Sequence, residues 1–161
     1  PQLKQKFPTH ASYAGKQITE VFTQEQLSAA SRKNVFTFAT AVFWGSKDGV
    51  LRTQPLPFEA QLAPVFAIMS DDWDDDGKKD LLLAGNFFGL NPQLGRYDAS
   101  YGTLLKGDGA GGFVALPMRS SGIRLSGQVR DALTLKQRNR KSVLIFATND
   151  AGVQFYAKAK R

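Results

Sequence analysis

One stretch of the chain reads Asp72-Trp73-Asp74-Asp75-Asp76-Gly77-Lys78-Lys79-Asp80, with the pattern D-x-D-x-D-G-x-x-D. Short apolar runs stand on both sides of it, at residues 66–69 and 81–84. Runs of that length between turn residues favour strands over helices. The stretch therefore predicts a strand–loop–strand unit and, with the similar runs elsewhere in the chain, a mainly β fold.

Alternating carboxylates in a tight loop are typical of a calcium site. Calcium is a hard cation that takes about six to eight oxygen ligands. Side chains at the first, third and fifth loop positions can turn inward around one ion, and glycine at the sixth position permits the sharp reversal. The seventh residue can offer its backbone carbonyl, and the ninth can close the shell directly or through water. We expect the ligands to be Asp72, Asp74, Asp76, Lys78 through its carbonyl, and Asp80.

The Asp-rich stretch has alternatives to a calcium loop. Without an ion the carboxylates would repel one another by roughly 1–4 kcal/mol per pair, yet a plain acidic surface loop stays open as an interpretation. An EF-hand needs Glu at the twelfth position and flanking helices, whereas Leu83 stands there within an apolar run. Magnesium fits less well, because it keeps more water and uses fewer protein ligands.

Short apolar or alternating runs separated by Gly, Asp and Asn recur along most of the chain. Residues 17–33 have the spacing of a helix, which Thr23 with Gln26 could divide into two pieces. Residues 1–16 have an irregular pattern. The expected strands lie at residues 36–44, 50–54, 64–70, 80–85, 101–106, 112–116, 128–135, 142–148 and 152–157.

An internal repeat indicates how these strands are organised. The turn Lys47-Asp48-Gly49 recurs as Gly107-Asp108-Gly109, and a Leu-Pro pair follows each turn. A strand, a loop and a very apolar strand come next in both copies. Repeated units of about four strands are the pattern of β-propeller blades.

The Asp-rich loop and the strand after it resemble the FG-GAP/VCBS repeat, the calcium-binding blade unit also found in the propellers of integrin α-subunits. The resemblance covers roughly residues 35–150 and extends to longer bacterial VCBS-repeat proteins. It rests on the Asp-rich loop and on the stretches at residues 55–61, 83–87, 95–100 and 107–109. The resemblance implies the same ligand set, namely Asp72, Asp74, Asp76, the Lys78 carbonyl and Asp80.

The resemblance also implies an architecture. We expect a mainly β fold, a partial β-propeller of two to three four-stranded antiparallel blades with a short N-terminal helix. Residues 1–161 would form one domain, with an extended segment and helix at 1–34 and the blades at 35–161. Because such propellers usually have about seven blades and the 161 residues supply two to three, we interpret the chain as the C-terminal part of a larger protein.

Two departures from the repeat pattern matter. Asp75 stands where family members often have glycine, although Asp tolerates a left-handed backbone better than most residues. The matching loop of the next unit, residues 136–141, has no carboxylate. We therefore expect no calcium in that second loop.

Composition excludes several classes of function. The chain has no cysteine and one histidine, His10, which excludes thiol chemistry and makes a Ser-His-Asp triad or a multi-His metal site improbable. No apolar run is long enough to span a membrane. The net charge of +7 is concentrated in the C-terminal third, where we interpret it as a solvated basic edge rather than a nucleic-acid surface.

A long loop after the Asp-rich unit carries the candidate ligand contacts Phe87, Phe88, Arg96, Tyr97 and Asp98. Aromatic and charged side chains on one loop are a mix that binds sugars or peptides. The alternative is that Arg96 pairs with Asp98 while the aromatic rings fill space between blades. We expect a non-enzymatic module for recognition, adhesion or scaffolding, with a protein or carbohydrate partner. Its expected place is extracellular, periplasmic or on the cell surface, and the alternative is an accessory or carbohydrate-binding part of a larger secreted enzyme.

Overall fold

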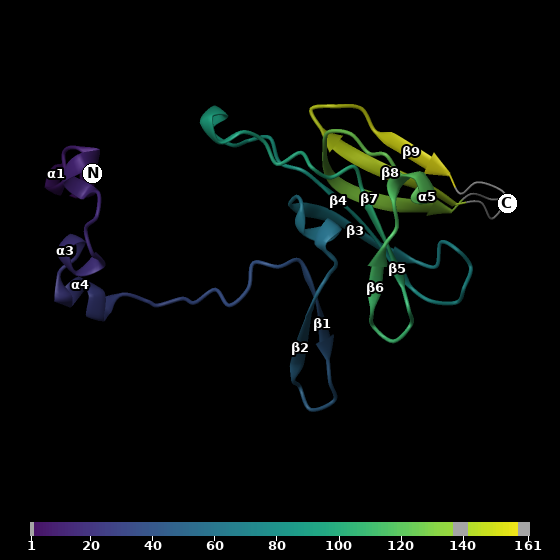
Figure 1. Cartoon of the computed structure of the whole chain (residues 1–161), viewed down its shortest axis with the longest axis horizontal. Helices are drawn as coiled ribbons and strands as arrows, with labels where there is room; N and C mark the ends of the chain where they lie inside the picture. Colours follow the sequence, from purple (N-terminus) through teal and green to yellow (C-terminus); the bar gives the residue numbers. More distant parts are fainter. Residues whose placement is uncertain (1, 137–141, 158–161) are drawn as a thin grey trace. The chain divides into compact units, whose positions relative to one another are not determined.

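The computed structural model describes residues 2–136 and 142–157 (Figure 1). Contacts divide the chain into two compact units, Pro1–Phe38 and Ala39–Arg161. The first unit contains short helices, and the second contains the antiparallel sheets that make the protein mainly β. Among the described residues, no helix has the length and apolar character that a membrane crossing requires. The loop at residues 136–141, for which no calcium was expected, lies mostly outside the described residues.

The N-terminal unit holds α1 (Gln2–Lys6), α2 (His10–Tyr13), α3 (Ile18–Val21) and α4 (Gln24–Ala29). The division of the predicted helix at Thr23 is confirmed, because the Thr23 and Gln26 side chains each accept the other's backbone N–H. The irregular segment predicted for residues 1–16 is wrong, since α1 and α2 lie there. Thr9 caps α2 through the same reciprocal arrangement with Ser12, a signal that the sequence analysis did not use.

The described residues of the second unit form nine strands, one for each predicted run. They form a hairpin, a four-stranded meander and a three-stranded meander, all antiparallel and each in chain order. The strands are β1 (Ala41–Gly45), β2 (Leu51–Pro55), β3 (Val65–Asp71), β4 (Asp80–Gly85), β5 (Thr103–Gly107), β6 (Phe113–Ala115), β7 (Gln128–Lys136), β8 (Ser142–Asn149) and β9 (Gln154–Ala157). Three further short helices lie between strands, η1 (Phe58–Gln61), η2 (Pro92–Leu94) and α5 (Met118–Ser121), so the expectation of a single helix is wrong.

The expected set of two to three four-stranded blades needs correction. One sheet, β3-β4-β5-β6, has four strands, whereas the other two have two and three, and no propeller is detected in the described residues. The first strand also begins later than predicted, at Ala41, which pairs with Pro55. The Leu56 N–H still donates to the Thr40 carbonyl at 3.0 Å, whereas Pro57 has no backbone N–H to continue the ladder, and η1 follows it.

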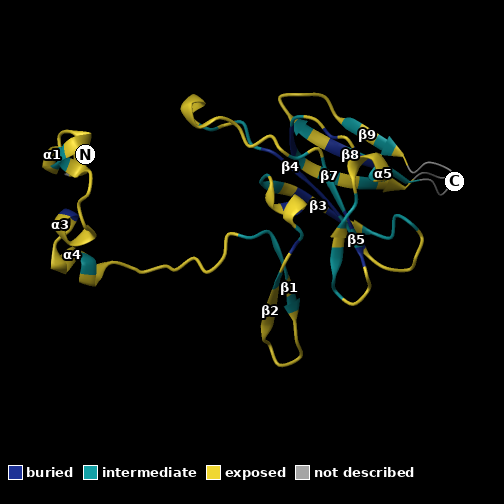
Figure 2. Cartoon of the chain, in the orientation of Figure 1, coloured by how far each residue is buried: buried dark blue, intermediate teal, exposed yellow. Residues whose placement is uncertain are grey.

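Strand β4 lies at the centre of the core and is buried along most of its length (Figure 2). Its alternating side chains reach two clusters because neighbouring residues of a strand point to opposite faces. Leu82 and Ala84 pack with Val129 and Phe146 of the three-stranded sheet. Leu83 packs on the other face, in a cluster that comprises Leu56, Ala60, Leu83 and Leu105.

Asn86 joins the end of β4 to two distant segments. Its side-chain Nδ2 donates to the carbonyls of Ser100 at 2.8 Å and Gly127 at 3.0 Å, and its Oδ1 accepts the Ser100 N–H at 3.1 Å. The residue is buried and its φ is 82°, a left-handed conformation that Asn adopts more readily than most residues. Both the amide and the backbone angle therefore favour Asn here.

We predict that Asn86→Ala lowers the free energy of unfolding by about 3 kcal/mol, because it orphans buried backbone groups and strains the left-handed backbone. Asn86→Gly loses the same hydrogen bonds, but glycine adopts the left-handed backbone without strain. Its free energy of unfolding should therefore be about 1 kcal/mol higher than that of the alanine variant. Urea unfolding of the three proteins measures both differences. Equal stability of Asn86→Ala and the wild type would contradict this account.

Candidate metal centre

The Asp-rich loop closes the end of the β3–β4 hairpin. Asp71 and Asp80 are paired residues of the two strands, so the ladder reaches the loop on both sides. Two residues in the loop have left-handed backbones, Asp75 with φ 63° and Gly77 with φ 82°. The prediction that Asp75 tolerates this conformation in place of glycine is confirmed.

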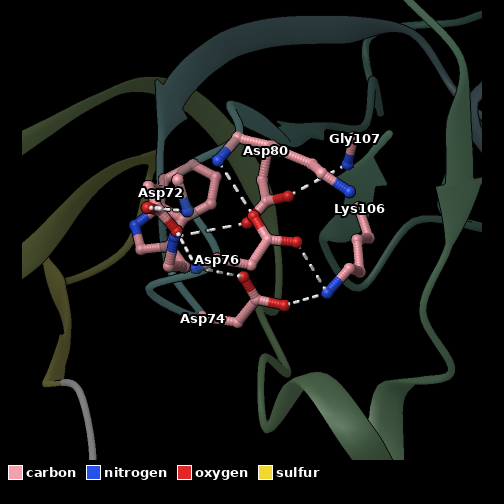
Figure 3. A network of polar contacts seen from close by, with 9 residues as sticks. Asp72, Asp74, Asp76, Asp80, Lys106 and Gly107 are labelled. Carbon is pink, nitrogen blue, oxygen red and sulfur yellow. Dashed lines mark hydrogen bonds and ion pairs between the residues drawn. The ribbon is translucent and has the colours of Figure 1, made fainter. Parts of the chain in front are cut away.

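Three carboxylates of the loop converge on one point (Figure 3). Asp72, Asp74 and Asp80 each offer one oxygen, and these oxygens lie within 4.8 Å of one another. Asp80 is 3% exposed, whereas the other two residues are half-buried. Three carboxylates at this spacing could hold a metal ion, and their hard oxygen atoms suit a hard cation.

Backbone N–H groups fix the orientation of these carboxylates. The Asp72 Oδ1 accepts the Asp76 N–H at 3.1 Å, and its Oδ2 accepts the Gly77 N–H at 2.8 Å. The Asp80 Oδ1 accepts the Gly107 N–H at 3.0 Å, and its Oδ2 accepts the Trp73 N–H at 3.2 Å. Each oxygen has more than one lone-pair site, so these bonds leave acceptor capacity for a cation.

The backbone of Gly107 in β5 lies directly against the loop. A Cβ on Gly107 would lie 2.1 Å from the Lys79 carbonyl oxygen, a distance that no side chain could occupy. The absence of a Cβ therefore lets the Gly107 N–H reach the Asp80 carboxylate. Gly107 opens the turn Gly107-Asp108-Gly109, the second copy of the repeated turn, although the sequence pattern gave it no role in the site.

Asp76, the fourth predicted carboxylate ligand, lies outside the group of three. Its Oδ1 accepts the Lys78 N–H at 2.9 Å, and its Oδ2 lies 3.1 Å from the Nζ of Lys106. The ammonium of Lys106, followed by the Lys78 N–H, holds the pKa of the Asp76 carboxyl below its usual range. The Lys78 carbonyl stays a predicted ligand.

Lys106 is the residue of this site that the sequence analysis missed. It lies in β5, and its ammonium contacts both Asp74 and Asp76 (Figure 3). These two carboxylates, Asp74 first, raise the pKa of the Lys106 ammonium. A signal did exist, because Lys106 is the one charged residue in the strand run Thr103-Leu104-Leu105-Lys106, and an antiparallel meander brings that strand beside β4.

Asp71 stands apart from the group of three carboxylates. Its Oδ1 accepts the Asp72 N–H at 2.9 Å and lies 3.3 Å from the Nζ of Lys79. The Asp72 N–H, more than Lys79, lowers the pKa of the Asp71 carboxyl. Asp71 and Lys79 therefore form a neighbouring charge pair, which offers a matched comparison for Lys106.

The predicted ligand loop is only partly brought together. Phe87, Phe88 and Arg96 line a cavity of about 520 Å³. Tyr97 exchanges backbone hydrogen bonds with Phe87, and neither Tyr97 nor Asp98 lines the cavity. In the part of the chain that the structure describes, no ion pair joins Arg96 to Asp98, and the Arg96 guanidinium lies over the Phe88 ring at 5.1 Å.

Comparison with known proteins gives no relative of the chain. No protein-family model, no curated protein and no solved structure matches it. The resemblance to FG-GAP/VCBS repeats accordingly rests on the residues of the chain itself.

We predict that Lys106→Met strengthens metal binding, because it removes a tethered cation that competes for Asp74. Because Lys106 contacts two carboxylates, we expect its removal to lower the Kd for calcium about tenfold. In metal-free buffer the same variant should unfold at a lower temperature, since Asp74 and Asp76 lose their counter-charge. Calorimetric titration with calcium and thermal unfolding measure the two effects.

The matched control is Lys79→Met, which changes the net charge equally but removes the partner of Asp71. Its calcium affinity should stay within about twofold of the wild type, because Asp71 lies outside the three converging carboxylates. If both variants gained calcium affinity by the same factor, the change in net charge alone would explain the gain. The contact of Lys106 with Asp74 would then have no specific effect on metal binding.

Proposed function

We propose that the chain is a calcium-binding segment of β-propeller type that serves recognition, adhesion or scaffolding outside the cell rather than catalysis. The observation that carries the proposal is the convergence of Asp72, Asp74 and Asp80 within 4.8 Å. Backbone N–H groups already hold Asp72 and Asp80 in place, so an ion would meet carboxylates that need little rearrangement.

Calcium is the cation that the donors favour. The donor set consists of carboxylate oxygens with a backbone carbonyl, Lys78, predicted in addition, and oxygen ligands of this kind suit calcium. Zinc and copper prefer imidazole or thiolate, and the chain has no cysteine and a single histidine, His10. Sites of this type are filled by the millimolar calcium found outside cells, which supports an extracellular, periplasmic or cell-surface location.

Sheet packing supports the propeller-type arrangement. The four-stranded sheet buries one face against the three-stranded sheet and the other against residues around β2 and η1, as a blade between two neighbours would. The outer side of the three-stranded sheet exposes the apolar residues Leu133, Leu135 and Phe155. In a propeller, such a face is covered by the next blade.

Four carboxyl groups with lowered pKa values are in keeping with a non-catalytic role. A general acid at neutral pH needs a raised carboxyl pKa, whereas hydrogen bonds from backbone N–H groups or lysine lower the pKa of Glu20, Asp71, Asp76 and Asp108. These lowered values suit groups that stay ionised and bind cations or cap turns.

We expect calcium to raise the thermal unfolding midpoint of the protein, because a ligand that binds only the folded state stabilises it. At free calcium about 100-fold above Kd, the gain in unfolding free energy should be about 2.7 kcal/mol. Calorimetry in calcium and in excess EGTA measures this gain for the wild type, Asp74→Ala and the control Asp98→Ala.

Asp74→Ala should lose the calcium effect, while Asp98→Ala, which removes an exposed carboxylate outside the site, should keep it. Identical midpoints of the wild type in calcium and in EGTA would exclude the calcium function. A calcium effect that survives in Asp74→Ala would place the ion elsewhere.

A further inference from the structure

A second site lies where the loop after β4 meets β7 and the turn after β8. The cavity there has a volume of about 520 Å³, within the range of small-molecule sites. Its walls include two aromatic rings, two arginines, two amides and one carboxylate, from Phe87, Phe88, Arg96, Gln128, Arg130, Asn149 and Asp150. All of these residues belong to the second unit, and none belongs to the Asp-rich loop.

Gln128 is the most informative residue of the cavity, because it is 8% exposed and polar. Its Oε1 accepts the Phe88 N–H at 2.8 Å and an Arg130 N–H at 2.7 Å. These two donors fix the orientation of the amide, since its nitrogen could not accept from either. The Nε2 group must therefore point the other way.

The Gln128 Nε2 has no hydrogen-bond partner among the described residues. Every side-chain polar atom that is shut off from solvent in the described residues does have a partner, so the Nε2 keeps some accessible surface, and Gln128 is one of the residues that line the cavity. A nearly buried amide with two unused N–H donors is costly unless an acceptor meets it. A ligand oxygen in the cavity could accept from this amide.

Arg130 is held rigidly behind this amide. Its guanidinium donates to the Asn86 carbonyl at 2.9 Å and lies over the Phe66 ring at 4.2 Å. With the bonds to Val129 and Gln128, three of its five N–H groups are used. Arg130 therefore adds a fixed positive charge to the cavity wall.

Arg96 supplies a second cation, and it has no carboxylate partner in the described part of the chain. Its guanidinium lies over the Phe88 ring at 5.1 Å, a contact that orients the planar group without using its donors. One acid lines the same cavity, Asp150, which accepts a hydrogen bond from the Asn149 side chain at 3.1 Å. The cavity is therefore rich in donors and carries net positive charge.

We propose that this cavity binds the carboxylate of a uronic acid unit in an acidic saccharide. Arg96 and the Gln128 amide would donate to the carboxylate, which is the geometry that a guanidinium fork favours. Asp150 would accept from sugar hydroxyls, and Phe87 and Phe88 would contact the apolar faces of the ring. A neutral sugar makes no use of the Arg96 charge, and an acidic peptide side chain offers Asp150 no hydroxyl.

The choice of an extracellular saccharide rests on the proposed recognition function, whereas the cavity is separate from the calcium site. The test is calorimetric titration with trigalacturonate in buffer freed of calcium by a chelating resin. Galactotriose, the neutral sugar of the same length, and a Glu-rich tripeptide are the comparison ligands. We expect trigalacturonate to bind at least tenfold more tightly than either.

Two variants test the residues. Arg96→Gln removes an exposed cation and should weaken trigalacturonate binding at least tenfold. Gln128→Glu keeps the acceptors for Phe88 and Arg130 but turns a carboxylate oxygen toward the cavity, so it should also weaken binding at least tenfold. Arg52→Gln, an equal loss of charge at an exposed position of β2, should leave Kd within twofold.

Several results would overturn the proposal. These are no binding of trigalacturonate by the folded wild type, equal binding of galactotriose, equal binding of the peptide, or equal losses in Arg96→Gln and Arg52→Gln. If Gln128→Glu fails to fold, Arg96→Gln alone decides. Repeating the titration with Asp74→Ala separates the two sites. If this variant still binds trigalacturonate, the uronate site does not depend on the metal centre, and the proposal holds even if calcium does not stabilise the wild type.

Discussion

Asp80 is a charged residue that is 3% exposed, and its carboxylate accepts N–H groups from two different parts of the chain. One donor is Trp73 within the Asp-rich loop, and the other is Gly107 in the neighbouring strand. Burying a charge is costly unless polar groups or a cation compensate it. That requirement links the loop, β4 and β5. The placement of the other loop carboxylates therefore depends on the hydrogen bonds that the Asp80 carboxylate accepts.

The same requirement explains the position of Lys106. Strand β5 pairs with β4 in the register Leu81↔Leu105, which carries the next residue of β5 to the carboxylates of the loop. Lys106 then compensates Asp74 and Asp76, while Asp72 and Asp80 rely on backbone N–H groups. The loop thus contains a partial internal counter-charge, and a bound dication would have to share Asp74 with it.

Strand β4 connects the two candidate sites. Its first residue is Asp80 of the metal centre, and its last residue, Gly85, precedes Asn86, whose carbonyl accepts from Arg130 of the cavity. Between them, side chains on both faces of β4 belong to the core clusters. Core packing therefore fixes the strand that positions the carboxylates at one end and the arginine contacts at the other.

Local patterns in the sequence determined the strands and the division of the helix at Thr23. They also determined the spacing of Asp72, Asp74 and Asp80, which suits calcium. Strand alternation, helix capping and the spacing of loop ligands all act over a few residues. Only the tertiary structure decided that Asp76 turns to Lys106, that Arg96 lies over Phe88 and not beside Asp98, and that Gln128 and Arg130 join the cavity. Lys106 is 32 residues from Asp74, and Arg130 is 44 residues from Asn86. Contacts over such separations are set by strand register and sheet packing, which no local pattern encodes.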